Sequence, residues 1–112
     1  MNVYDTVNKL ATEIKNSNEY LEYKKIKEEI NANDELKGKI KEFEKDRYQV
    51  QMLAMQTGSP NEEMYKKIQE DYTELVKNEI VMKYFDAELK FNVLLADVNK
   101  IIGEAVRDVI EM

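Results

Sequence analysis

Residues 78–110 read NEIVMKYFDAELKFNVLLADVNKIIGEAVRDVI, a stretch with one glycine and no proline. Apolar residues recur along it at alternating spacings of four and three, the heptad repeat that is typical of coiled-coil-like packing. This heptad seam consists of Ile80, Tyr84, Ala87, Phe91, Leu94, Val98, Ile101 and Ala105. We therefore predict one long helix over residues 79–110, apolar at every position of the seam.

A second apolar stripe lies beside the heptad seam and widens the apolar face of this helix. At 1.5 Å per residue the helix is about 50 Å long, whereas a compact monomer of this chain length is roughly 35 Å across. We interpret the seam as packing within the chain and the second stripe as a surface that another subunit covers, which favours a homodimer. The oligomer-interface candidates are the residues of this stripe: Val81, Phe85, Leu95, Ile102, Val106 and Val109. The alternative is an elongated monomer whose first two helices lie end to end over the same surface.

Four more helices are predicted upstream, over residues 3–15, 18–31, 34–57 and 60–77. The first carries an apolar face at helical spacing, and the polar residues 16–18 separate it from the second. The residues of that face are Val3, Val7, Leu10 and Ile14. The fold class expected is all-α: an elongated antiparallel bundle of about five helices with a long C-terminal coiled-coil-like helix, forming a single domain over residues 1–112.

The connection after residue 57 has the signals of a turn between two antiparallel helices. Gly58 suits a left-handed position at the end of a helix. Ser59 is a good N-cap, Pro60 suits a first helical turn, and Ser59 with Glu62 would make a capping box. We predict a helical hairpin here.

The charge balance and the missing residue types limit the function classes. The chain has 23 acidic and 17 basic residues, and its net charge of −6 disfavours nucleic acid as a partner. It has no cysteine and no histidine, which removes thiolate sites, disulfides and the usual catalytic bases. The N-terminus lacks the apolar core of a signal peptide, and the apolar stretches are interrupted by charges. A cytoplasmic protein without membrane insertion is expected.

No arrangement of residues with catalytic chemistry is recognisable. Acidic pairs such as Glu28 with Glu29 are neighbours in sequence, so they point to different sides of a helix, as on a solvated surface. There is no glycine-rich phosphate loop. We expect a non-enzymatic protein without catalytic residues, metal ligands or a cofactor. The alternatives are an RNA-binding protein that uses Lys37, Lys41 and Lys45, although acidic residues stand on adjoining faces, or a structural assembly protein.

Residues 48–55 are the best candidate for docking a partner protein. Tyrosine and methionine are enriched where proteins meet partners, and the candidates are Tyr48, Met52, Leu53 and Met55. Methionine that fills gaps in a bundle core is the alternative explanation. Arg47 interrupts the apolar stripe of the same helix, where its stem could pack while its charged head reaches water.

The seven tyrosines of the chain divide into two groups. Four of them, Tyr23, Tyr65, Tyr72 and Tyr84, fall on apolar stripes, and we interpret them as core or interface residues. Tyr20, Tyr48 and Tyr4 fit the stripes less well, which favours contact with a partner.

Two stretches of the chain resemble the YlbF/YmcA/YheA family of small helical bacterial proteins. They are NSNEYLEYKKIKEEINANDELK at residues 16–37 and NEIVMKYFDAELKFNVLLADVNKII at residues 78–102, and the glycine turn at Gly58 is similar too. The resemblance covers nearly the whole chain. It implies an all-helical, oligomeric, cytoplasmic protein without a catalytic centre, which acts as an adaptor or regulatory subunit of a protein complex.

In some branches of that family such complexes are linked to competence, sporulation, biofilm formation and messenger-RNA processing. Those branches carry cysteines associated with iron–sulfur clusters, and this chain has no cysteine. The cluster is therefore not carried over to this chain, which looks closest to the cysteine-free, YheA-like branch.

Overall fold

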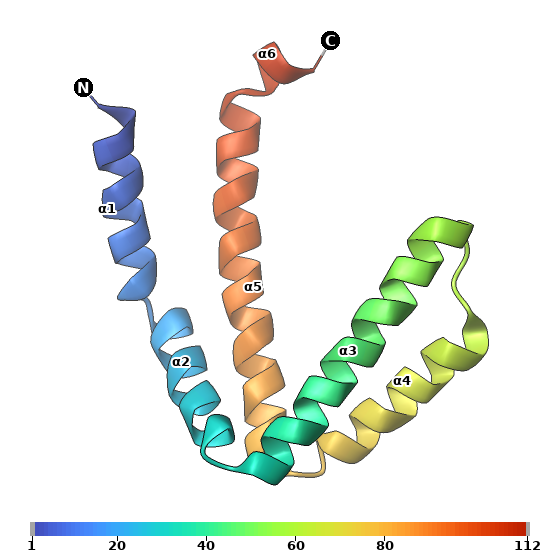
Figure 1. Cartoon of the computed structure of the whole chain (residues 1–112). Coiled ribbons are helices and arrows are strands. Elements are labelled where there is room, and N and C mark those ends of the chain that lie inside the picture. Colours follow the sequence, from blue (N-terminus) through green and yellow to red (C-terminus); the bar gives the residue numbers. More distant parts are fainter. Residues whose placement is uncertain (1, 112) are drawn as a thin grey trace. The chain divides into compact units, whose positions relative to one another are not determined.

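The computed structural model describes residues 2–111, which form six α-helices and no strand (Figure 1). The helices are α1 (Val3–Lys15), α2 (Asn18–Asn31), α3 (Asp34–Thr57), α4 (Glu62–Leu75), α5 (Glu79–Ala105) and α6 (Arg107–Ile110). The all-α prediction is confirmed. The single helix expected over residues 79–110 is wrong at its end, because Val106 leaves the helical conformation with φ −111° and ψ 8°. Every residue from 101 to 110 is exposed, so no packing supports a continuous helix there.

The chain forms two compact units. Unit 1 comprises the chain up to Ile26 and from Tyr84 onward, and unit 2 comprises Lys27–Lys83. Helices α2 and α5 each continue from one unit into the other, so the boundary between the units falls inside helices rather than in linkers. The single-domain organisation stays a prediction.

In unit 1, α1 and α2 follow each other along α5 and run antiparallel to it (Figure 1). Aromatic rings join α2 to α5: the ring centroid of Tyr23 lies 5.7 Å from those of Tyr84 and Phe91, and that of Tyr20 lies 6.0 Å from Phe91. Such offset and tilted ring pairs contribute about 0.5–1.5 kcal/mol each beyond the area that they bury. This cluster fixes α2 against α5. Tyr20, which the sequence favoured as a partner contact, belongs to it.

Helix α1 differs from α2 because it buries none of its residues. Its N-terminus is capped by Asn2. The side chain of Asn2 accepts a hydrogen bond from the backbone N–H of Tyr4 at 2.9 Å and satisfies one of the free donors of the first turn. Local capping thus explains why residues 3–15 are helical. It does not provide a partner for their apolar face.

In unit 2, α3 and α4 form the predicted hairpin, and Ile40, Phe43 and Val50 of α3 are buried. The centroid of the Phe43 ring lies 6.1 Å from that of Tyr72 on α4. Gly58 has φ 76°, and its N–H donates to the carbonyl of Ala54, so the left-handed helix end predicted from the sequence is present.

The start of α4 corrects the prediction of a capping box. The N-cap is Asn61, whose side chain accepts from the N–H of Met64 at 3.1 Å and whose carbonyl accepts from Tyr65. The carbonyl of Ser59 instead accepts from the Thr57 hydroxyl at 2.8 Å, which holds Ser59 in the turn. An N-cap carbonyl accepts the first helical hydrogen bond, and here the carbonyl of Asn61 does so, which makes Asn61 rather than Ser59 the N-cap. Helix α4 therefore begins at Glu62, after Pro60 rather than at it.

Candidate interaction surfaces

Two of the six oligomer-interface candidates are core residues. Val81 is 0% exposed and Phe85 is also buried within the single chain. They lie at the beginning of α5, where Tyr84 and Ala87 are buried as well, so the chain itself covers this part of the helix. The prediction that another subunit covers Val81 and Phe85 is wrong.

The other four candidates lie along the second half of α5 and beyond its end. Leu95 is half-buried, whereas Ile102, Val106 and Val109 are 51%, 41% and 82% exposed. Ile101 of the heptad seam is exposed in the same region. Whether an apolar residue of α5 is buried therefore depends on its position along the helix and not on the stripe to which it belongs. The prediction that the heptad seam packs within the chain is wrong at this end of α5. The apolar pattern continues after the chain has stopped covering it.

Helix α1 adds a second exposed apolar surface to the same end of unit 1, where both chain termini lie (Figure 1). Val3, Tyr4 and Val7 are exposed, and Leu10 and Ile14 are half-buried. We call this region the open end of unit 1: the exposed apolar residues of α1 together with Ile101, Ile102, Val106 and Val109. Large contiguous patches of exposed apolar residues mark interaction sites on proteins, so the open end is a candidate interaction surface.

The predicted docking residues of α3 lie in unit 2. Tyr48 and Met55 are exposed, Leu53 is exposed to a smaller degree, and Met52 is half-buried. Tyr48, Met52 and Met55 are spaced four and three apart, which places them on one face of the helix. They are thus accessible to a partner, and their role in docking stays a prediction.

The charged side chains lie at the surface in the described part of the chain, where no charged residue is buried. Ion pairs join residues three or four apart on one helix, as between Lys90 Nζ and Asp86 Oδ2 at 3.1 Å. The hydrogen bond to Asp86, and then its charge and that of Glu22, raise the pKa of Lys90. Exposed pairs of this type contribute little to stability, because water screens them. They support helices rather than chemistry.

Neither a metal site nor a membrane span is formed by residues 2–111. No three acidic side chains come together there in a way that could hold a metal ion. None of the helices among these residues combines the length and the apolar character that a membrane crossing requires. The features that stand out on this surface are its apolar areas.

Comparison with known proteins places the chain in a family. The family described as "Control of competence regulator ComK, YlbF/YmcA" matches residues 3–107. The chain belongs to the YlbF/YmcA family. The matched range runs from the start of α1 to the first residue of α6, so the fold just described is that of a family member. The family resemblance predicted from the sequence is confirmed.

Several relatives in this family are named UPF0342 proteins. One from Halothermothrix orenii is 35% identical over 103 residues, which cover 91% of this chain and 86% of the relative. One from Clostridium novyi is 35% identical over 109 residues, covering 96% and 95%. One from Alkalihalophilus pseudofirmus is 31% identical over 108 residues, covering 96% and 92%. The family description refers to the control of a regulator and names no reaction.

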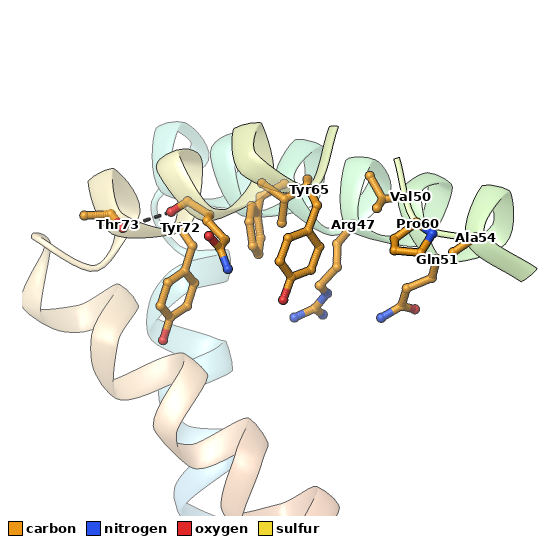
Figure 2. Close-up of a pocket in the computed structure, with 11 residues that line it drawn as sticks. Arg47, Val50, Gln51, Ala54, Pro60, Tyr65, Tyr72 and Thr73 are labelled. Carbon is orange, nitrogen blue, oxygen red and sulfur yellow. Dashed lines mark hydrogen bonds between the residues drawn. The ribbon is translucent and has the colours of Figure 1, made fainter. Parts of the chain in front are cut away.

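Sequence reasoning missed one feature of the surface, the groove between α3 and α4 (Figure 2). Its lining includes Tyr65 and Tyr72, which were interpreted as core or interface residues but are 52% and 42% exposed. The sequence feature that could have indicated this groove is Arg47, a charged residue within an otherwise apolar stripe. A stripe that tolerates a guanidinium is one that water or a ligand can reach.

Proposed function

We propose that this protein is a non-enzymatic adaptor or regulatory subunit of a bacterial protein complex and that it acts as a homodimer. The observation that carries the proposal is the open end of unit 1. There α1 buries no residue, and α5 keeps its apolar repeat through Ile101 and Ile102 although the chain does not cover them. In a homodimer, the same surface of a second copy covers the exposed apolar residues of α1 and α5.

The regulatory part of the proposal rests on the family. The family description concerns the control of a competence regulator. The resemblance described above also implies links to sporulation, biofilm formation and RNA processing in some branches of the family. The net charge of −6 favours protein over nucleic acid as the partner, and the acidic residues Glu42 and Asp46 stand beside the lysines considered for RNA. We place this function in the cytoplasm.

Light scattering of the purified chain between 1 and 100 µM tests the dimer. The expected mass is about 26 kDa, twice the 13.2 kDa of one chain. A mass of 13.2 kDa over this whole range would contradict it.

Capture of the tagged protein from its native cell, followed by mass spectrometry, tests the adaptor role. A stoichiometric protein partner is expected, and repeated recovery of the chain alone argues against an adaptor.

A further inference from the structure

The break between α5 and α6 interrupts an apolar stripe that continues in the sequence. Ile102 and Val106 are four residues apart and Val109 follows after three more, the spacing that keeps residues on one face of a helix. In the structure α5 ends at Ala105, and α6 turns away from the axis of α5 (Figure 1). Val109 therefore leaves the face that carries Ile102. The spacing of these residues fits one continuous helix better than two separate ones.

The sequence around the break contains none of the usual signals that end a helix. Residues 104–110 include neither proline nor glycine. Gly103 lies inside α5 and lacks the positive φ of a left-handed helix end. Val106 occupies the N-cap position of α6 without a side-chain hydrogen bond, and valine is a poor N-cap. Capping therefore does not explain why the helix breaks at this residue.

The break is also small in conformational terms. Val106 has φ −111° and ψ 8°, so each of its two dihedral angles differs from the helical value by about 50°. The residues after it are already helical. The N–H of Ile110 donates to the carbonyl of Val106 at 3.2 Å, and that of Glu111 donates to the carbonyl of Arg107 at 2.9 Å. A change at one residue would thus join α6 to α5.

Charges and solvent exposure oppose a continuous helix in the single chain. In such a helix Glu104 and Asp108 are four residues apart and repel each other. In the broken helix, Asp108 lies in the first turn of α6, where a negative charge is favourable. Packing that could offset these terms is missing, because residues 101–110 are exposed. Burial of Val106 and Val109, which are 41% and 82% exposed, would supply it.

We infer that dimer formation closes the break, so that residues 79–110 form one continuous helix whose Ile102, Val106 and Val109 contact a second copy of the chain. This inference rests on the homodimer proposed above and adds a folding step to it. Ordering that accompanies binding uses part of the interaction energy, so the helicity of this segment controls how tightly the two copies associate.

The backbone chemical shifts of Val106 and Arg107 report the break directly. We expect helical Cα shifts at both residues in isotope-labelled wild-type protein at a concentration where light scattering gives twice the mass of one chain. A dimer whose Val106 shift is not helical overturns the inference and leaves the homodimer intact. A wild-type mass of one chain from 1 to 100 µM overturns both, so the two failures can be told apart.

A matched pair of variants at Arg107 provides the second test. Proline suits the first residue of a separate α6, but inside a continuous helix it removes a backbone donor and clashes with the preceding turn. We expect Arg107→Pro to raise the dissociation constant of the dimer more than 100-fold. Arg107→Ala removes the same side chain and its ion pair with Glu111, and it should leave the dissociation constant within about threefold.

Light scattering over a dilution series measures both variants. Similar dissociation constants for Arg107→Pro and Arg107→Ala overturn the inference, because the dimer then accepts a broken helix. Circular dichroism should show that Arg107→Pro keeps the fold, since residues 101–110 are exposed. If Arg107→Pro does not fold, the chemical shifts of the wild-type dimer decide the question.

Discussion

Replacing Ile102 by glutamate is expected to split the proposed dimer into folded monomers. Ile102 is 51% exposed in the single chain, so one chain accepts a charged side chain there. Fully burying an isoleucine side chain contributes about 1.5–3 kcal/mol, so burying the exposed half contributes about 1 kcal/mol per chain. A two-fold interface contains the residue twice, and the substitution therefore removes about 2 kcal/mol of apolar burial from the dimer.

The introduced carboxylate adds a second cost. An unpaired polar group that loses water costs about 1–3 kcal/mol, and two copies add at least about 2 kcal/mol. The total of about 4 kcal/mol raises the dissociation constant of the dimer about 1,000-fold. A dimer with a submicromolar dissociation constant would then be largely monomeric at 20 µM.

Light scattering at 20 µM, together with circular dichroism, measures both parts of this prediction. Ile102→Glu should give about 13 kDa with a helical spectrum like that of the wild type. Ala96→Glu is the control, since it puts the same charge at an exposed position of α5, about 120° around the helix from Ile102. The reasoning is refuted if Ile102→Glu keeps the wild-type mass or if Ala96→Glu dissociates the dimer equally. Unfolding of Ile102→Glu would refute it too, by placing Ile102 in a core.

Three other predictions follow from the local structure. Val81→Ala removes two methyl groups from a residue with 0% exposure, and we expect a loss of about 2 kcal/mol and a melting temperature lower by about 8 °C, with no change in light-scattering mass. At both Gly58 and Gly38 an added methyl group meets no atom within 4 Å. Gly58→Ala should lower the free energy of urea unfolding by about 1 kcal/mol because φ is 76°, whereas Gly38→Ala inside α3 should raise it by about 0.5–1 kcal/mol. Asp86→Asn should lower the pKa of Lys90 in an NMR titration, because the Asp86 hydrogen bond raises it. The stability that comes from this raised pKa is present below the ordinary lysine pKa and is lost as the pH rises through the raised value.

The ends of the early helices could be predicted because short polar residues determine them. α1, α2 and α3 have the predicted bounds, and the Asn33 side chain accepts from the N–H of Leu36 at 3.1 Å as an N-cap should. The start of α4 could not be predicted, because Ser59 and Asn61 are equally good caps in isolation. The hydrogen bonds from the N–H groups of Met64 and Tyr65 to Asn61 identify Asn61 as the cap.

The interaction surfaces were harder to predict than the helices. Periodicity shows which side of a helix is apolar, but it does not show whether anything covers that side. Val81 and Ile102 are both β-branched apolar residues of the same stripe, and one is buried while the other is exposed. Tyr20 fits the apolar stripes less well and was predicted to contact a partner, yet the fold brings it to Phe91, 71 positions later in the chain. These outcomes depend on where each helix lies in space, which local sequence does not specify.

The position of α1 bears on the choice between the dimer and the elongated monomer. That monomer requires α1 and α2, end to end, to cover the apolar face of α5. Helix α2 meets this requirement, because its rings pack on Tyr84 and Phe91. Helix α1 meets it only in part, since Leu10 and Ile14 are half-buried while Ile101 and Ile102 stay exposed. A two-fold related copy would bring α1 and α5 of both chains together as four helices around one apolar core, and it would cover both exposed surfaces at once.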